Sequence, residues 1–265
     1  MHFLLISDPL DPRLDDYHNV PDPELVQRGG MFVAEGRLVV RRLLTESSLV
    51  TRSVMVTEAA RASLDEVLVM RPDVPVYVVP PPVMNGITGF NIHRGCLALG
   101  ERPQPSAWQD VVAGLQTIVV LERVANADNV GGIFRNAAAF GVRAVLLDEA
   151  STDPLYRKAI RTSMGASLLV PFARAEPWPA VLRELRASGF ATVAMTPATS
   201  ASTVRSIADA VGARPVALVL GHEGDGLTTA ALEACEYHAR IPTTSTVDSL
   251  NVATAAAIAL YEFSR

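Results

Sequence analysis

Three polar turns in the second half of the chain carry the side chains best suited to chemistry. The first spans residues 126–135 (Asn-Ala-Asp-Asn-Val-Gly-Gly-Ile-Phe-Arg), follows an apolar run typical of a strand and opens a segment typical of a helix. Gly131 and Gly132 permit close approach of a backbone or ligand, and amides at a helix start favour an anion. Two interpretations stay open. Either Asn129 and Arg135 act on a ligand, or Asn129 caps the helix and Arg135 is a surface cation.

The second turn, residues 221–226 (Gly-His-Glu-Gly-Asp-Gly), follows the apolar run Leu218–Leu220. Glycines at a strand end expose backbone N–H and C=O groups that can form hydrogen bonds with an adenine or a carboxylate. Glu223 and Asp225 repel phosphate, and the lysine of a P-loop is absent. A neutral or cationic small ligand therefore fits better than a phosphate, and a plain tight turn is the alternative.

The third turn runs from Ile241 to Val252 and precedes an apolar helix. We expect Ser249 to be the N-cap of that helix and Asn251 to face a site from its first turn. Capping alone is the alternative interpretation. The helix has too little polar surface to be solvated, so it is central in the monomer or packs against a partner subunit.

Alternating apolar and amphipathic segments predict an α/β protein with a mostly parallel sheet and helices on both sides. Such sheets bind ligands at the carboxyl ends of their strands. The Pro- and polar-rich segment 103–106 is the best linker candidate, which divides the chain into residues 1–105 and 106–265. In the first part the pattern predicts strands over 51–56, 74–79 and 95–100 and helices over 35–46 and 58–70. In the second part it predicts strands over 117–121, 144–147, 190–195, 215–220 and 237–241 and helices over 129–140, 155–164 and 249–263.

Composition excludes several classes of protein. Hydrophobic residues make up 49% of the 265 residues and charged residues 19%, which excludes general disorder. The net charge of −5 argues against a wholly basic nucleic-acid wrapper and leaves room for a local basic patch. Cys96 and Cys235 form no CxxC pair and the histidines show no metal spacing, so we expect no disulfide framework and no metal site. No signal peptide or membrane span is predicted, and the expected location is cytoplasmic.

In this order and at strand ends, the three turns resemble the SpoU/TrmH branch of the SPOUT RNA methyltransferases. The family pattern Asn-x-Gly-x-x-x-Arg matches residues 129–135, Leu-Gly-x-Glu-Gly matches 220–224, and Ile-Pro followed by Ser-Leu-Asn-Val matches 241–242 and 249–252. The likeness covers residues 115–265. Residues 32–36 (Phe-Val-Ala-Glu-Gly) and 95–100 resemble the substrate-binding domain of the family more loosely.

The resemblance implies a SPOUT-type parallel sheet with a C-terminal trefoil knot over residues 106–265, preceded by a small α/β (L30e-like) RNA substrate-binding domain over residues 1–105. It implies transfer of a methyl group from S-adenosylmethionine to a ribose 2′-hydroxyl in tRNA or rRNA by a homodimer, without a metal or a membrane. The implied catalytic positions are Asn129, Arg135, Glu223, Ser249 and Asn251. The implied cofactor-binding positions are Leu220, Gly221, Ile241 and Leu250.

This sequence departs from the family pattern at His222, which fills a position often held by a small residue, and at residues 243–245. Both departures concern the lining of the cofactor pocket. The alternative function is a catalytically silent RNA-binding protein on the same scaffold. A nicotinamide-dependent dehydrogenase is disfavoured, because the glycine spacing is not that of the dinucleotide fingerprint GxGxxG.

A cluster of cations, Arg157, Lys158 and Arg161, forms the densest positive patch in the second part, with two of them on one helix face. The functional interpretation is contact with RNA phosphates. Arg37 and Arg41 have the same spacing in the first part, beside Arg42. A solvated helix face is the alternative for both groups.

Overall fold

The computed structural model of the chain describes residues 3–18, 22, 25, 30–88, 95–244 and 249–264. The chain folds into two compact units. The first comprises Met1–Gln104 and Leu155–Leu169, and the second comprises Pro105–Pro154 and Val170–Arg265. The segment Leu155–Leu169, which we expected in the second part, thus packs with the first. The chain therefore passes between the units three times.

The first unit is built on a five-stranded mixed sheet in the order β1-β4-β3-β5-β2. The strands β1, β3 and β4 run parallel, and β5 is antiparallel to both β3 and β2. The predicted strand over residues 51–56 is confirmed, and the predicted helix over residues 58–70 is confirmed to within one residue. The strands are β1 (Phe3–Leu5), β2 (Met31–Glu35), β3 (Thr51–Val56), β4 (Val76–Val78) and β5 (Cys96–Glu101). The helices are η1 (Pro12–Tyr17), α2 (Arg37–Thr45), α3 (Glu58–Val69), α4 (Pro81–Thr88), α7 (Arg157–Thr162) and η2 (Ala166–Leu168).

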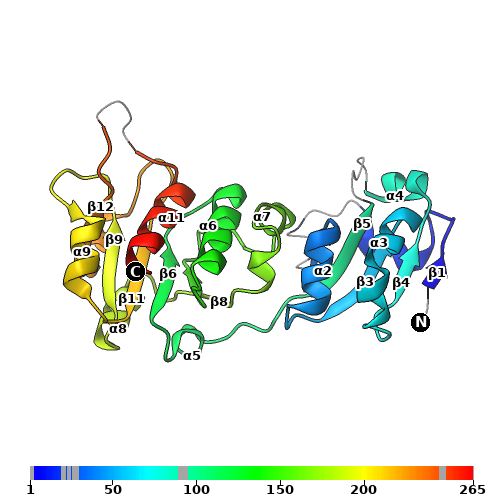
Figure 1. Ribbon diagram of the computed structural model, residues 1–265, viewed down its shortest axis with the longest axis horizontal. Helices are drawn as coiled ribbons and strands as arrows, with labels where there is room; N and C mark the ends of the chain where they lie inside the picture. Colours follow the sequence, from blue (N-terminus) through cyan, green and yellow to red (C-terminus); the bar gives the residue numbers. More distant parts are fainter. Residues whose placement is uncertain are drawn as a thin grey trace. The chain divides into compact units, whose positions relative to one another are not determined.

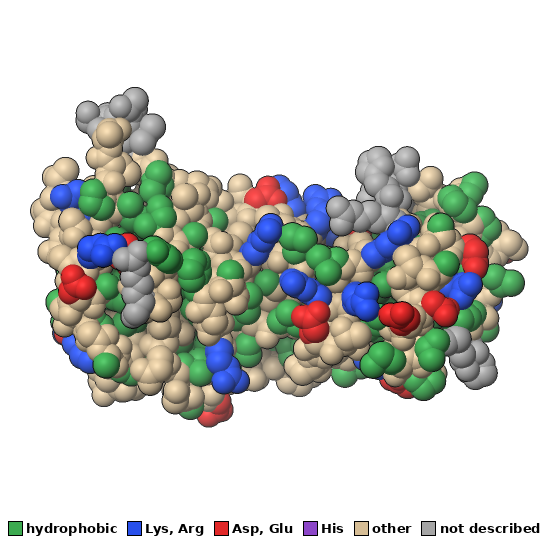
Figure 2. Space-filling model, in the orientation of Figure 1, with side chains coloured by type: hydrophobic (Ala, Val, Ile, Leu, Met, Phe, Trp, Pro, Cys, Tyr) green, Lys and Arg blue, Asp and Glu red, His purple; other side chains and the backbone are tan. Residues whose placement is uncertain are grey.

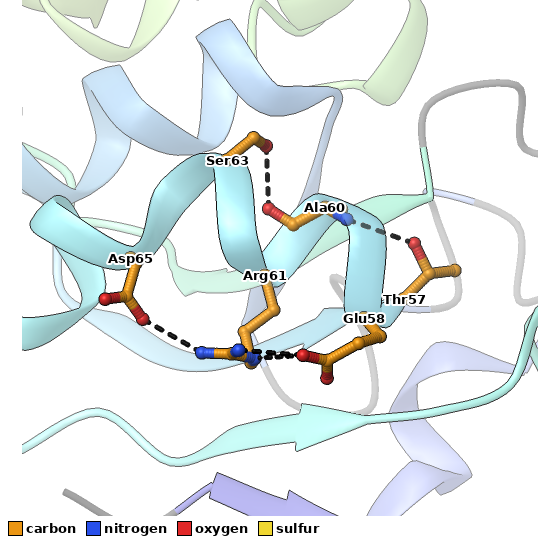
Figure 3. A network of polar contacts seen from close by, with 6 residues as sticks. All are labelled: Thr57, Glu58, Ala60, Arg61, Ser63 and Asp65. Atoms are coloured by element: carbon orange, nitrogen blue, oxygen red, sulfur yellow. Dashed lines mark hydrogen bonds and ion pairs between the residues drawn. The ribbon is translucent and has the colours of Figure 1, made fainter.

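Arg61 joins two carboxylates of helix α3 (Figure 3) and also contacts the edge strand β1. The guanidinium donates hydrogen bonds to Glu58 at 2.7 and 2.9 Å and to Asp65 at 2.9 Å, and it lies 5.1 Å from the centre of the Phe3 ring. Thr57 caps the helix by accepting a hydrogen bond from the backbone N–H of Ala60. A single cation thus links both carboxylates of one helix face to an edge strand of three residues.

Helix α7 belongs to the first unit because it packs against β2 and because the turn after it is bonded to α2 and the residues that follow it. Arg42 Nη1 donates to the carbonyl of Met164 at 2.9 Å, and Ser47 Oγ donates to the carbonyl of Leu168 at 2.6 Å. Gly165, with φ of +83°, makes the turn between these contacts and lies against Arg42. The cations of α2 and α7 therefore share one unit of the fold.

The second unit contains a seven-stranded sheet in the order β10-β12-β9-β11-β6-β7-β8, and every strand pair in it is parallel. This confirms the predicted parallel sheet. The strands are β6 (Thr117–Leu121), β7 (Val145–Leu147), β8 (Phe172–Arg174), β9 (Ala191–Met195), β10 (Ser202–Thr203), β11 (Val216–Leu220) and β12 (Tyr237–Arg240). The helices are α5 (Trp108–Val112), α6 (Ala127–Ala139), α8 (Ala180–Ala187), α9 (Val204–Val211), α10 (Thr229–Ala234) and α11 (Val252–Phe263).

Helices cover both faces of this sheet, as in other parallel sheets. Ile118, Val120 and Val219 point to one face, where they pack with residues of α5, α8 and α10. Helix α11 contacts strand β11 of the sheet and the helices α6 and α9. These three helices lie over the opposite face (Figure 1). All five residues of β11 are buried, so its continuous apolar run reflects a central strand. The expected knot involves the third turn, where residues 245–248 lie outside the described residues.

No helix in the described part of the chain is long and apolar enough to cross a membrane.

Candidate active site

A pocket of about 370 Å³ lies in the second unit at the carboxyl ends of the neighbouring strands β9, β11 and β12. This is the edge at which parallel α/β sheets bind ligands, and the volume lies in the range of small-molecule sites. All four expected cofactor-binding residues line the pocket, as do Glu223 and Ser249. The lining comprises residues 195–198, 220–227 and 249–250 together with Leu232, Ile241, Thr243, Val252 and Ala255.

The glycine at position 221 is required by the way the loop after β11 closes on itself. A Cβ atom there would lie 2.4 Å from the backbone carbon of Gly226 and 2.4 Å from the backbone nitrogen of Leu227. No side chain fits at that distance. Gly221 therefore lets the two arms of the loop touch, and the loop forms one wall of the pocket.

Hydrogen bonds between side chains join the three polar turns. Asn129 Nδ2 donates to Glu223 Oε1 at 2.8 Å, and Asn251 Nδ2 donates to Asn129 Oδ1 at 2.8 Å. The backbone N–H of Asn126 donates to the same Glu223 oxygen at 3.2 Å. Asn129 is only 8% exposed, so its amide is held by both partners in a nearly dry position. Three of the five expected catalytic residues thus form one connected chain beside the pocket.

At the third turn the helix cap differs from our expectation, and at the first turn the alternative that Asn129 caps the helix is not realised. Helix α11 begins at Val252 with Asn251 as its N-cap, because the Asn251 Oδ1 atom accepts from the backbone N–H of Ala253 at 2.9 Å and of Thr254 at 3.3 Å. The prediction that Ser249 caps this helix is therefore wrong, and Ser249 lines the pocket instead. Helix α6 is capped by Asn126, which leaves Asn129 free to bond across the site.

The Glu223 carboxylate is stabilised in its ionised form. Its partial burial alone would raise the pKa, but the hydrogen bonds from Asn129 and from the backbone N–H groups of Glu223 and Asn126 outweigh burial and hold the pKa below the ordinary value of 4.5. The charged form of Glu223 therefore stabilises the fold above about pH 4.5, and this contribution is lost as the pH falls through the lowered pKa.

Arg135 is exposed on α6. It lies six residues after Asn129, so the two side chains leave the helix axis about 120° apart. Among the described residues it forms no hydrogen bond or ion pair. Within the described residues, Asn129 and Asn126, and not Arg135, bond to the Oε1 atom of Glu223. The Arg135 guanidinium is available to a ligand from outside.

The closeness of α6 and α11 fixes Asn129 against Asn251. A Cβ atom on Gly132 would lie 2.9 Å from the Cβ of Ala253, so glycine is needed for the approach. Asn136, one turn further along α6, donates from Nδ2 to the carbonyl of Ala253 at 2.7 Å. We expected close approach at Gly132, and the neighbour proves to be helix α11. Asn136 is a positioning residue that the sequence analysis missed.

A buried carboxylate after β6 holds the far wall of the pocket in place. Glu122 is only 1% exposed and accepts from Trp178 Nε1 at 2.6 Å, from the backbone N–H of Thr228 at 2.8 Å and from Thr228 Oγ1 at 2.7 Å. Because Thr228 follows directly on Leu227 and caps α10, Glu122 anchors the end of the glycine-rich loop. These hydrogen bonds compensate for the burial of the charge.

A second buried carboxylate, Asp148, stands directly after β7. Its Oδ1 atom accepts from the backbone N–H of Arg123 at 3.0 Å and from the N–H and hydroxyl of Ser151 at 2.9 and 2.6 Å. It thereby fixes the loop that leads into α6 and Asn129. The sequence analysis missed Glu122 and Asp148, although an acidic residue directly after an apolar strand was a visible signal for both.

Within the described residues, no group of three His, Cys, Asp or Glu side chains is placed to hold a metal ion. Cys96 and Cys235 are buried free thiols, and burial raises the pKa of each to about 12. Neither thiol therefore ionises near neutral pH.

The cation cluster lies on α7 in the first unit, and the pocket lies in the second. Lys158 and Arg161 are exposed, and Arg157 is half-buried with its backbone N–H donating to Asp22 at 3.1 Å. The cluster thus does not line the pocket.

These observations define an α/β protein with a small-molecule pocket at the carboxyl edge of a parallel sheet, and known proteins share this arrangement. The profile of the SpoU rRNA Methylase family matches residues 116–261. An uncharacterized tRNA/rRNA methyltransferase of Mycobacterium tuberculosis is 44% identical over 265 residues, which cover 98% of this chain and 91% of that protein. The chain therefore belongs to the SpoU rRNA methylase family.

Solved structures extend the likeness to the whole fold. The crystal structure of an rRNA methyltransferase from Sinorhizobium meliloti matches 99% of this chain and 98% of its own with a TM-score of 0.83 at 26% identity. An AdoMet-bound form from the same organism matches 98% and 97% with a TM-score of 0.83 at 27% identity. A structure described as an RNA 2′-O ribose methyltransferase matches 98% of each chain with a TM-score of 0.77 at 25% identity.

Replacing Asn129 by Ala removes the side-chain donor that lowers the pKa of Glu223. We expect the pKa of Glu223 to rise in the Asn129→Ala variant, because burial then acts with fewer opposing hydrogen bonds. A carbon-13 NMR titration of the Glu223 carboxyl group measures this change. Asn136→Ala is the matched control, because Asn136 lies on the same helix but bonds to Ala253. A Glu223 pKa that is unchanged in Asn129→Ala would contradict the hydrogen-bond account.

Proposed function

We propose that this protein transfers a methyl group from S-adenosylmethionine to a ribose 2′-hydroxyl in tRNA or rRNA. The observation that carries the proposal is the hydrogen-bonded chain of Glu223, Asn129 and Asn251 beside the pocket. It brings together residues from all three family motifs. Family membership supports RNA methylation, and the 2′-O ribose methyltransferase among the solved structures supports the choice of acceptor.

The chemistry of the pocket suits S-adenosylmethionine, which would supply an activated methyl group on a positively charged sulfur. Leu220, Leu227 and Leu250 offer apolar surface for an adenine ring. Glu223 and Asp225 place negative charge in the wall, which favours a cation. The expected cofactor contacts at Gly221 and Ile241 lie in the same lining. We propose that these residues hold the cofactor.

In this proposal the protein aligns the reactants and stabilises charge. Good alignment of two reactants can supply about 7–11 kcal/mol. Arg135 binds the phosphate or ribose beside the attacking 2′-oxygen and stabilises the negative charge that develops there. Its guanidinium stays protonated in proteins, which favours an electrostatic role over that of a general base. Glu223, Asn129 and Asn251 keep the three turns in register, and Ser249 faces the pocket, where its hydroxyl can bond to the ribose.

Replacing Arg135 by Ala tests the assigned role. We expect methyl transfer to fall about 100- to 1,000-fold, because a donor to the developing oxyanion is lost. Affinity for S-adenosylmethionine should be unchanged, because Arg135 does not line the pocket. Mass spectrometry of ribose methylation in RNA from cells lacking the gene, incubated with the protein, measures the first quantity, and calorimetry measures the second.

Arg143→Ala, an exposed arginine just beyond the end of α6, is the control and should retain activity. An Arg135→Ala variant with wild-type activity would contradict the assignment. A wild-type protein that binds RNA but not S-adenosylmethionine would instead favour the alternative of a silent RNA-binding protein. Mapping of ribose methylation in total RNA with and without the gene identifies the substrate.

We further propose that α7 binds RNA phosphates through Arg157, Lys158 and Arg161. Two features support this. Lys158 and Arg161 are exposed, and α7 shares the first unit with α2, which carries further arginines. Arg42 of α2 reaches the turn after α7 directly. A basic surface confined to these helices accommodates RNA on a chain whose net charge is −5.

The double variant Lys158→Ala/Arg161→Ala should bind RNA more weakly and with less dependence on salt. The loss of two phosphate contacts should reduce the slope of log K against log salt concentration by about 1.4–1.8. Fluorescence anisotropy with purified total tRNA and rRNA measures this. The control is Arg183→Ala/Arg186→Ala, which removes two exposed cations from α8 in the second unit. An equal change of slope in both double variants would contradict a dedicated RNA surface on α7.

We also propose that the chain acts as a homodimer through α11. Hydrophobic side chains gather along this helix (Figure 2), and Tyr261, which packs on Phe140, remains 47% exposed. Exposed apolar surface of this kind is typical of an interface.

Sedimentation equilibrium should give twice the chain mass of 28.3 kDa for the wild type and a lighter species for Tyr261→Glu, because a charge at the interface is costly to bury. A monomeric wild type would contradict the proposal.

A further inference from the structure

The loop after β11 is closed by backbone hydrogen bonds across its base. The N–H of His222 donates to the carbonyl of Gly226 at 3.2 Å, and the N–H of Gly226 donates to the carbonyl of His222 at 3.0 Å. At the base of the loop, the backbone of Gly221 also lies directly against the backbone of Gly226 and Leu227. The residues between them, 223–225, form the tip of the loop and line the pocket.

The His222 imidazole holds this tip. Its Nδ1 atom accepts hydrogen bonds from the backbone N–H of Gly224 at 3.0 Å and from that of Asp225 at 3.1 Å. Two donors directed at one ring nitrogen require a free lone pair there. Nδ1 is therefore unprotonated, and in the neutral ring the proton sits on Nε2. An imidazolium would place a third donor against the two N–H groups and release the tip.

The bonding within the loop also sets what the pocket wall offers to a ligand. The amides of residues 222, 224, 225 and 226 are all held by partners inside the loop. These four amides are therefore not offered to a ligand, and the acidic groups of the wall are the carboxylates of Glu223 and Asp225. Such a wall favours a positively charged ligand over an anion.

The charged groups around His222 come from two elements. Asp225 Oδ2 lies 3.9 Å from His222 Nδ1, and Arg123, from the loop after β6, pairs with the same Asp225 oxygen at 3.1 Å. Glu223 is the other ionised neighbour on the loop. Within the pocket lining described above, His222, Glu223 and Asp225 are the titratable side chains. Histidine is the residue type whose charge changes between pH 5 and 8.

We propose that His222 is a positioning and specificity residue for the cofactor, whose unprotonated Nδ1 shapes the loop into an electron-rich wall that selects a sulfonium. This inference rests on the proposed function. Protonation of His222 has two consequences. It releases the tip of the loop, which weakens every ligand of the pocket, and it adds positive charge to the wall, which weakens a cationic ligand further. S-adenosylmethionine should therefore lose more affinity in acid than S-adenosylhomocysteine, whose sulfur is neutral.

Two variants separate these effects. His222→Ala removes the acceptor. His222→Asn keeps an acceptor, because its Oδ1 atom occupies about the place of Nδ1 and bonds N–H groups two and three residues on, and it does not titrate. At pH 8 we expect His222→Ala to bind S-adenosylmethionine roughly tenfold more weakly than the wild type, because two hydrogen bonds are lost. His222→Asn should bind about as tightly as the wild type.

Calorimetry with the full chain, from pH 8 to pH 5.5, provides the decisive comparison. The dissociation constant of the wild type for S-adenosylmethionine should rise as the pH falls, and that for S-adenosylhomocysteine should rise less. Both should stay nearly constant in His222→Asn. Wild-type affinity of His222→Ala at pH 8, or the same pH dependence in His222→Asn as in the wild type, would overturn the inference.

Nitrogen-15 NMR of the imidazole in the ligand-free protein gives a second readout. It should show Nδ1 unprotonated at pH 8, and a proton on Nδ1 would overturn the inference without any bearing on the proposed function. A wild type with the expected tautomer that binds no S-adenosylmethionine would overturn the proposed function, and this inference with it. Thermal unfolding of each variant verifies that the fold is retained.

Discussion

The hydrogen bond from Asn129 to Glu223 depends on a constraint that governs the second unit, namely that parallel strands all end at the same edge of the sheet. The two residues are 94 positions apart in sequence, yet each follows closely on a strand. Because β6 and β11 are direct neighbours in register from Val216 and Thr117 to Leu220 and Leu121, their two exit loops meet. The same edge receives the end of β12 and the start of α11, which brings Asn251 to Asn129.

Polar groups at this edge are arranged in two layers. Glu223 lines the pocket and is bonded through Asn129 to Asn251, and the buried carboxylates Glu122 and Asp148 hold the loops from which the site is built. A buried carboxylate is costly unless its oxygens are bonded, and both residues accept several hydrogen bonds from backbone N–H and side-chain groups. These hydrogen bonds anchor loops that have no regular structure of their own. Rigid placement of this kind is what catalysis by alignment requires.

Much of the second unit could be predicted from the sequence. Short continuous apolar runs such as residues 117–121 and 215–220 are typical of buried parallel strands and of few other structures. The expected cofactor-binding positions came instead from the resemblance to the SpoU/TrmH family, and each of them lies at or beyond a strand end and lines the pocket. Short elements such as β8 and β10 were missed. These strands have three and two residues, which is too few to show a repeating pattern of apolar and polar residues. The cap of α11 was misplaced because Ser249 and Asn251 are both good caps, and only the backbone decides between them. Whether Arg135 lies on the exposed or the buried face of α6 depends on how the helix packs. The sequence pattern around Arg135 does not determine this. Nothing in the residue pattern of α7 indicates whether the helix packs with the first unit or with the second.

The placement of α7 has a consequence for the way this protein can change over evolution. The family match over residues 116–261 includes the segment Leu155–Leu169, which the fold assigns to the other unit. Recombination at the linker near residue 104 would therefore not exchange a complete structural unit. The exchange would replace the five-stranded sheet but keep the original α7. Helix α7 contacts β2 of that sheet, and the residues that follow α7 are bonded to Arg42 and Ser47. Substitutions in α7 therefore have to remain compatible with β2 and α2 in the first unit, although α7 lies between two segments of the second unit in the sequence.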